Sequence, residues 1–152
     1  FSRGRLGFNY RWPALQAAVG IAQLEKLDRM LALRSEAASR YAELLSGVDG
    51  VRLAPADDAD HRRSWFVYVV ELPPEIDRAR VMVELRERGI DVAEYVPCIH
   101  LLTYMRERYG FSEGLCPVAE DIAGRTLALP FFPGIEPGDQ EYVVETLRSA
   151  LA

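Results

Sequence analysis

Two polar side chains near the start of the chain have the chemistry of a recognition site. Asn9 can both donate hydrogen bonds to a phosphate or hydroxyl and accept them. Arg11 carries a planar guanidinium that can hold an anion through paired hydrogen bonds. Gly7 favours a turn before them, and Pro13 suits the first position of the helix that follows. Polar groups fixed at the mouth of a buried helix can be held rigidly, as a binding site requires.

A second candidate is His100, which lies in a loop stiffened by Pro97 and flanked by Ile99. Functional residues are common in such loops between extended and helical segments. On the residues alone, a structural hydrogen bond and a place in a binding site are both open for this imidazole. Cys98, in the same loop, has no neighbour in the sequence that would activate its thiol, so we do not expect a nucleophile.

The sequence contains no self-contained catalytic set. It has no glycine-rich phosphate loop, no His/Cys/carboxylate cluster at metal-ligand spacing and no serine nucleophile elbow. Its only lysine, Lys26, falls inside a predicted helix and is expected to be solvated. Three aspartates within residues 56–63 lack the glycine and bidentate glutamate of a calcium loop, so a solvated connection with an exposed His61 is expected. We predict no catalytic residue and no metal site in this chain.

Composition excludes several classes of protein. The 152 residues are 49% hydrophobic and 27% charged, which is typical of one globular domain with a real core. A net charge of −5 without a basic stripe argues against a nucleic-acid partner. No apolar run is long enough to span a bilayer. Cys98 and Cys116 are too few for a disulfide framework, and we expect a cytoplasmic setting.

The candidate residues near the start must be positioned by the helix that follows. After an N-terminal loop over residues 1–13, the pattern predicts one long helix over residues 14–46, closed by Gly47 and Gly50. Residues 14–24 are apolar almost all round, which favours a helix buried between subunits. A central helix of a monomer is the alternative.

Residues 50–152 predict an α+β layer. Strands are expected at residues 51–53, 64–72 and 126–129, with short extended segments at 90–93 and 94–96. Helices are expected over residues 77–88 and 105–110, and from residues 117 and 136 onwards. We therefore predict an α+β fold in which the long helix precedes a small, mostly antiparallel sheet with helices packed on one face.

Three passages resemble the sugar-nucleotide aminotransferases of the DegT/StrS type, which are pyridoxal-phosphate (PLP) enzymes of fold type I. Residues 7–24 are similar to the family's passage GxNxR…xxQAAxGxxQL. Residues 95–101 resemble its YFPPIHL loop, and residues 127–132 its LALPFF strand. The three occur in the family's order, and the resemblance covers essentially all 152 residues but only the C-terminal part of the family's length.

The resemblance implies roles for four residues. The residue matching Asn9 reaches the cofactor phosphate of the partner subunit, and Arg11 in the same corner would meet the anionic substrate or amino donor. His100 lies in the loop that borders the sugar-nucleotide site, with Tyr95 as a further substrate-binding candidate. The family works as a homodimer, which assigns the interface to the helix over residues 14–24.

The resemblance also implies what the chain lacks. The large PLP-binding domain, with the Schiff-base lysine, comes earlier in such proteins, and a chain that begins at Phe1 fits an upstream portion that is missing. Two departures stand out: Trp12 replaces a smaller apolar residue, and Cys98 replaces the second proline of the loop, which frees a backbone N–H.

The sequence thus predicts the C-terminal small domain of an aminotransferase, inactive alone. The complete enzyme would transfer an amino group from an amino acid, expected to be glutamate, to a keto-sugar nucleotide. Two alternatives stay open. One is a family member with altered chemistry, a dehydratase or a regulator. The other is a non-catalytic α+β module that dimerises through residues 14–24.

Overall fold

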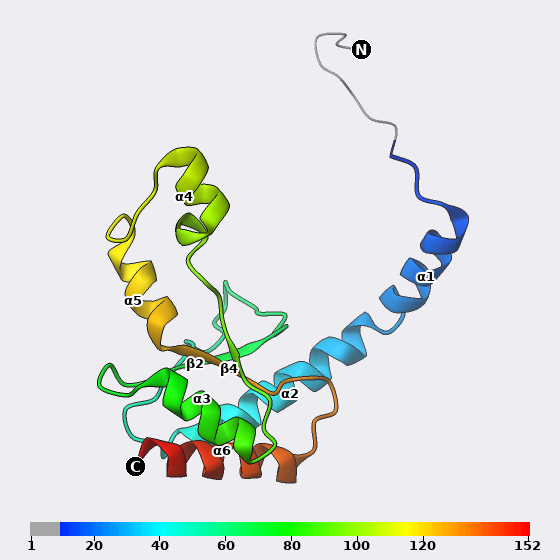
Figure 1. The fold of residues 1–152 in the computed structure, drawn as a ribbon. Helices are drawn as coiled ribbons and strands as arrows, with labels where there is room; N and C mark the ends of the chain where they lie inside the picture. The colour runs from blue at the N-terminus through cyan, green and yellow to red at the C-terminus, as the bar shows by residue number, and fades with distance from the viewer. Residues whose placement is uncertain (1–9) are drawn as a thin grey trace.

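A computed structural model describes residues 10–152. These residues form a layered base from which two helical arms project (Figure 1). The base, as we call it, is a four-stranded sheet with helices α2 (Leu27–Leu45), α3 (Arg78–Glu87) and α6 (Pro137–Leu151). The α1 arm is residues 10–24, with helix α1 (Ala14–Leu24). The α4–α5 arm is residues 95–125, and it contains the 3-10 helix η1 and helices α4 and α5. Their bounds are Ile99–Leu101, Thr103–Tyr109 and Pro117–Arg125.

The sheet is antiparallel throughout, in the order β1-β2-β4-β3. Its strands are β1 (Arg52–Leu53), β2 (Tyr68–Glu71), β3 (Ala93–Glu94) and β4 (Thr126–Leu129). The two longest strands are central and pair over four residues each. This confirms the predicted α+β fold with a small antiparallel sheet and helices on one face.

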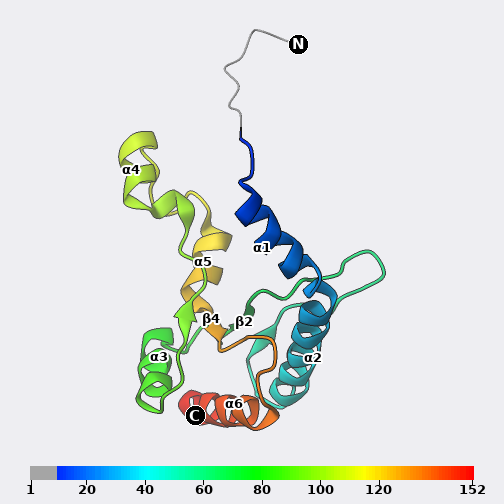
Figure 2. The same cartoon turned by 90° about the vertical axis from the view of Figure 1, so that its right-hand side faces the viewer.

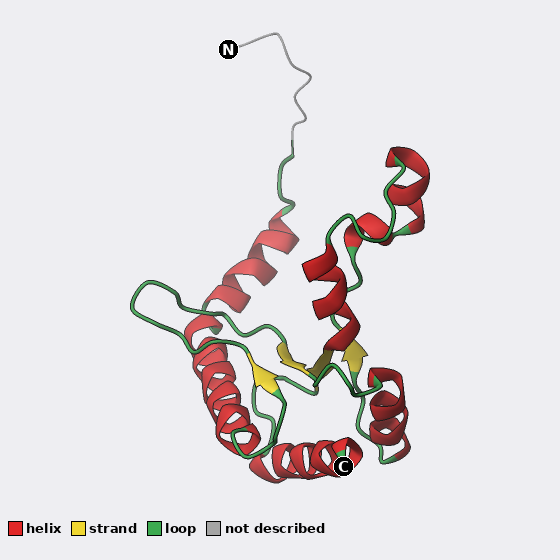
Figure 3. Cartoon of the chain, turned by 90° about the vertical axis from the view of Figure 1, so that its left-hand side faces the viewer, coloured by secondary structure: helices red, strands yellow, loops and turns green. Residues whose placement is uncertain are grey.

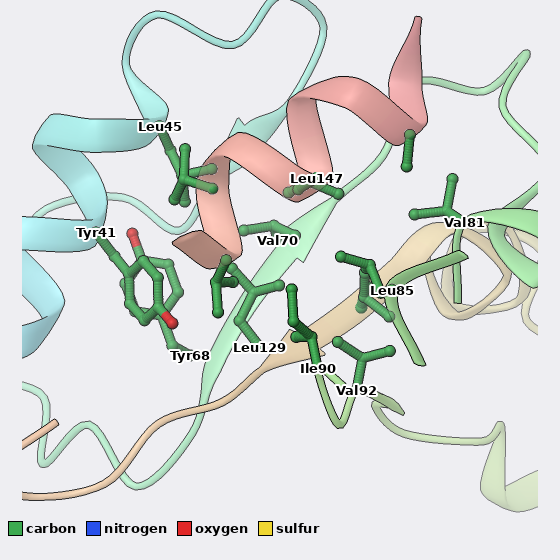
Figure 4. Packing of buried hydrophobic residues seen from close by; sticks show 14 of the residues in the cluster. Tyr41, Leu45, Tyr68, Val70, Val81, Leu85, Ile90, Val92, Leu129 and Leu147 are labelled. Atoms are coloured by element: carbon green, nitrogen blue, oxygen red, sulfur yellow. The ribbon is translucent and has the colours of Figure 1, made fainter. Parts of the chain in front are cut away.

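The core of the base lies between the sheet and its three helices (Figure 4). Tyr41 from α2 lies beside Tyr68 from β2, with ring centroids 4.9 Å apart, and its hydroxyl donates to the carbonyl oxygen of Pro130 at 2.9 Å. Leu85 from α3 and Leu147 from α6 complete the helical side, and both are fully buried. Apolar residues from four elements, α2, β2, α3 and α6, therefore hold the base together.

One buried polar side chain joins two helices of the base. Gln140 on α6 is fully buried; it donates to the carbonyl oxygen of Ala37 at 2.9 Å and accepts from the Arg40 guanidinium at 2.6 Å. Both ends of the amide are satisfied, which removes most of the cost of burying it.

Both arms rise from the same side of the base, away from α6, in all three views (Figures 1, 2 and 3). The α1 arm continues from α2, and the α4–α5 arm joins the sheet between β3 and β4. No residue of α1, α4 or α5 is buried. Among residues 10–152, no helix combines the length and the apolar character needed to cross a membrane.

The structure divides the helix predicted over residues 14–46 into α1 and α2. Glu25 and Lys26 form a turn in which the Lys26 N–H bonds back to the carbonyl of Gln23, and α2 then restarts the helical ladder. Neither residue is a helix breaker, so composition does not mark this turn. The apolar face does change there, because the stripe through Leu15 and Val19 gives way to another that starts at Leu24.

The strand predicted over residues 64–72 is shorter than expected. Trp65 has a φ of +48°, which no strand residue adopts, and regular pairing begins only at Tyr68. The indole stacks on the Tyr68 ring with centroids 5.7 Å apart, and the Arg63 guanidinium lies over the indole, 5.3 Å from the ring centroid. Aromatic packing thus accounts for the β-like composition of these residues.

Local end signals predicted helix α3 well. The Asp77 carboxylate caps it by accepting from the Ala79 N–H at 2.9 Å, and Gly89 follows with a φ of +78°.

Candidate functional site

A pocket of about 470 Å³ lies on the α4–α5 arm, where residues 95–100 face helix α5. Its volume is in the range of small-molecule sites. The wall from the first segment is Tyr95, Val96, Pro97, Cys98, Ile99 and His100, and the facing wall includes Cys116, Ala119 and Ile122. The structure therefore brings two predicted substrate-binding residues, Tyr95 and His100, to one pocket.

His100 lies in η1, and its side chain is only 12% exposed. Its Nε2 atom is 2.8 Å from Oε1 of Glu120 on α5. The imidazole thus has the structural hydrogen bond that the sequence left open, and it also lines the pocket. The two interpretations of His100 are compatible.

Glu120 is held by the backbone as well as by His100. Its carboxylate accepts from the N–H groups of Gly114, at 2.8 Å, and Cys116, at 3.0 Å. These two bonds, followed by the His100 contact, keep the pKa of the Glu120 carboxyl below its usual range. A fixed negative charge therefore stands directly behind the imidazole.

Tyr95 is anchored at the other end of the pocket. Its carbonyl oxygen accepts from the Thr126 hydroxyl at 2.7 Å, and its ring meets Phe66 edge to face at 5.9 Å. Between the two candidates, the Cys98 thiol is 3.5 Å from the carbonyl oxygen of Ala119. The loop thus contacts both the sheet and α5 despite losing a proline at position 98.

The α1 arm carries the other candidates. Arg11 is exposed, and Asn9 lies outside the described residues, as does Gly7. Behind Arg11 the Trp12 ring lies over Gly20, where a Cβ would meet an indole carbon at 3.2 Å. Large apolar side chains on this arm are open to solvent: Tyr10 is 85% exposed, and Trp12, Leu15, Val19, Ile21 and Leu24 are all more than half exposed.

An apolar hollow of about 460 Å³ follows this surface where α1 meets α2. It is lined by Trp12, Ala17, Gly20, Ile21, Gln23, Leu24, Leu27 and Met30. Because α1 contributes nothing to the core of the base, it is not the central helix of the described chain, which was the alternative to an interface helix.

Arg11 and His100 do not meet within one chain, since Figure 1 shows the two arms well apart. The described candidate residues are therefore in two places: Arg11 lies on the α1 arm, and Tyr95 and His100 line the pocket on the α4–α5 arm. Both arms are on the same side of the base (Figure 3).

The remaining described residues with reactive or metal-binding side chains do not form a site. A hollow of about 590 Å³ at residues 55–63 is bordered by charged side chains, and His61 there is 78% exposed, as predicted, and bonded to Asp58 at 2.8 Å. Lys26 is exposed in the turn between α1 and α2. Residues 10–152 contain no group of three or more potential metal ligands.

Sequence reasoning missed Glu120. The available signal was an acidic residue in the first turn of a helix that begins with Pro117, a position where carboxylates commonly accept from backbone N–H groups. Its pairing with His100, twenty residues away, has no local signature.

Comparison with known proteins gives one family. The sequence model of the DegT/DnrJ/EryC1/StrS aminotransferase family matches residues 1–148. The chain is 35% identical over 137 residues to a dTDP-4-dehydro-2,3,6-trideoxy-D-glucose 4-aminotransferase of Saccharopolyspora spinosa, a match that covers 90% of this chain and 34% of that protein. It is 32% identical over 143 residues to a pleiotropic regulatory protein of Geobacillus stearothermophilus, covering 93% and 38%.

Among solved structures, the fold is similar to that of DesV from S. venezuelae, which was crystallised with a ketimine intermediate. The TM-score is 0.82 at 30% identity, over 98% of this chain and 39% of DesV. The chain thus spans little more than a third of the length of the proteins it matches.

Proposed function

The chain belongs to the DegT/DnrJ/EryC1/StrS aminotransferase family, and on this basis we propose that it is the small C-terminal domain of a PLP-dependent sugar-nucleotide aminotransferase. The complete enzyme would transfer an amino group from an amino acid, expected to be glutamate, to a keto-sugar nucleotide. The family match over residues 1–148 carries the proposal. The relative from Saccharopolyspora spinosa, itself named a sugar aminotransferase, supports it.

The described residues do not form a PLP site by themselves. The one lysine, Lys26, is exposed in the turn after α1, and no side chain of the α4–α5 pocket can form a Schiff base. We therefore expect the 152-residue chain to be inactive alone, and we assign its residues to binding and not to covalent chemistry.

Each arm would serve a different part of a shared site. Arg11 would hold a carboxylate or phosphate through its guanidinium fork. His100 and Tyr95 would border the sugar nucleotide from the pocket on the other arm. Asn9, which lies outside the described residues, is proposed to contact the cofactor phosphate of a partner subunit.

The exposed apolar side chains of α1 support a homodimer through residues 14–24. Leu15 is 79% exposed and Leu24 is 68% exposed, and a contiguous apolar surface of this kind favours association. An interface there would place Arg11, at the tip of the arm, next to the neighbouring subunit. The cytoplasmic location expected from the sequence stays a prediction.

The test uses the full-length protein that contains this chain. After addition of PLP we expect a visible absorbance band of the bound cofactor that is lost when glutamate is added. A keto-sugar nucleotide should then gain an amino group, measured by mass spectrometry. A bound-cofactor band with no amino transfer to any keto-sugar nucleotide would contradict the proposal.

That contrary outcome would favour altered chemistry within the family. A specific observation keeps this second candidate open, because the relative from Geobacillus stearothermophilus carries the name of a regulatory protein.

A further inference from the structure

Glu120 joins three separate pieces of the α4–α5 arm. One carboxylate accepts from the backbone of Gly114 in the turn before α5, from the backbone of Cys116 at the start of α5, and contacts Nε2 of His100 in η1. The Glu120 carboxylate is thus the charged group through which α5 contacts the segment that carries His100. The side chain is 19% exposed, and it does not line the pocket.

The chemistry of this contact fixes the proton on the imidazole. The backbone bonds keep the Glu120 carboxyl ionised at neutral pH, and a carboxylate can only accept hydrogen bonds. The 2.8 Å contact is therefore a bond in which Nε2–H of His100 donates. The other ring nitrogen, Nδ1, is the one through which His100 can contact a ligand.

We propose that Glu120 is a positioning residue for the sugar-nucleotide site: it holds His100 against α5 and sets the tautomer in which Nδ1 serves the substrate. The proposal rests on the proposed function, because it takes His100 to border the sugar nucleotide. Glu120 acts through His100 and touches no reacting atom. In many proteins, a carboxylate that accepts from one ring N–H of a histidine fixes the orientation of the ring and the tautomer in which the other nitrogen binds a ligand.

The first test is independent of any activity. Residues His61 and His100 are the only histidines of the chain, so replacing His61 with glutamine leaves a single imidazole to observe. Long-range ¹H–¹⁵N spectra of the 152-residue chain, at a pH where the ring is neutral, should show the proton on Nε2. A proton on Nδ1 in this protein would overturn the proposal.

The second test is kinetic, in the full-length protein. In Glu120→Gln the amide oxygen can still accept, but its NH₂ group donates, so the side chain cannot accept from His100, Gly114 and Cys116 together. We expect KM for the keto-sugar nucleotide to rise about 10-fold with kcat within about 2-fold, the pattern of lost binding. The amino-donor half-reaction should keep its rate.

A matched control removes a charge from the same arm. Glu107→Gln, on the exposed surface of α4, should leave both half-reactions unchanged. In a His100→Ala background, Glu120→Gln should add less than about a 2-fold further loss, because the two residues act as one unit.

The failures of the two proposals are distinguishable. A missing donor half-reaction would contradict the proposed function. A normal donor half-reaction with an unchanged sugar-nucleotide KM in Glu120→Gln, or with fully additive effects of the two substitutions, would overturn the role of Glu120 alone.

Discussion

Leucine side chains are buried in the core of the base but exposed on the α1 arm. Leu127 in β4 and Leu147 in α6 are fully buried, whereas Leu15 and Leu24 in α1 are 79% and 68% exposed. The base satisfies its apolar and polar groups within one chain. The α1 arm leaves large apolar side chains exposed, and we propose that a neighbouring subunit covers them. The contacts that stabilise the fold therefore lie in the base, whereas the α1 arm carries the proposed interface.

The largest contrast is expected from the same substitution made in both regions. Leu127→Ala should lower the free energy of unfolding by about 2–5 kcal/mol, because it leaves a cavity in a closed core. Leu15→Ala should change it by less than about 0.5 kcal/mol, since little contact is lost. Urea unfolding at low protein concentration measures both. Equal losses would contradict the division between base and arm.

The second prediction concerns association of the arm. We expect the chain to self-associate, and Ile21→Glu, in the apolar hollow with Trp12, to weaken association by about 2–4 kcal/mol. Gln16→Glu adds the same charge at a polar, exposed position of α1 and serves as control. Sedimentation measures the dissociation constants. A monomeric wild-type chain at high concentration would refute the interface.

These contrasts bear on what the sequence could predict. Elements with local signals were found: the Asp77 cap of α3, Pro117 at the start of α5, and the apolar run of β4. The break between α1 and α2 has no glycine or proline, and only the change of apolar face hints at it. Trp65 is a residue type that is common in strands, but its ring stacks on Tyr68 and its backbone has a positive φ, so the strand does not include it.

The site was predictable to a similar extent. Tyr95 and His100 were chosen from one loop, and the structure places both on one pocket. Arg11 is predicted to lie in a site shared between subunits, and no local sequence pattern shows how the arms of two subunits would be arranged. Glu120 was missed because its three bonds come from distant backbone and side-chain groups.

The third prediction tests how closely the base depends on its buried amide. Gln140→Leu keeps the volume but leaves the Arg40 guanidinium and the Ala37 carbonyl without this partner. We expect a loss of about 1–3 kcal/mol in the free energy of unfolding. Glu141→Leu, at the next and exposed position, should change stability by less than about 0.5 kcal/mol. Similar losses for both would show that the amide network adds nothing.

The smallest predicted effect is a pH dependence confined to the base. Burial raises the pKa of Tyr68 from 10.0 to about 12 and also raises the pKa of Tyr41. A raised pKa means that the folded state holds the phenol proton after the unfolded state has lost it. Stability is therefore complete below pH 10 and falls as the pH rises toward 12, with about 1 kcal/mol lost between pH 10 and 11 through Tyr68.

Unfolding curves across this range test the prediction, with Tyr68→Phe as the informative variant. Its stability should decline less steeply with pH than that of the wild type. An equal slope in both proteins would remove Tyr68 as the cause.

The turn at Glu25 and Lys26 is the only connection between α1 and the base among the described residues, so a small change in its angle would displace the far end of α1. Helix α1 has 11 residues and is therefore about 16 Å long, so a rotation of about 10° at the turn moves its far end by about 3 Å. Hydrogen-bond geometry tolerates only a few tenths of an ångström. If α1 forms the proposed dimer interface, the position of Arg11 would therefore be fixed by the contacts of the arm with the neighbouring subunit, and not by the turn at its base.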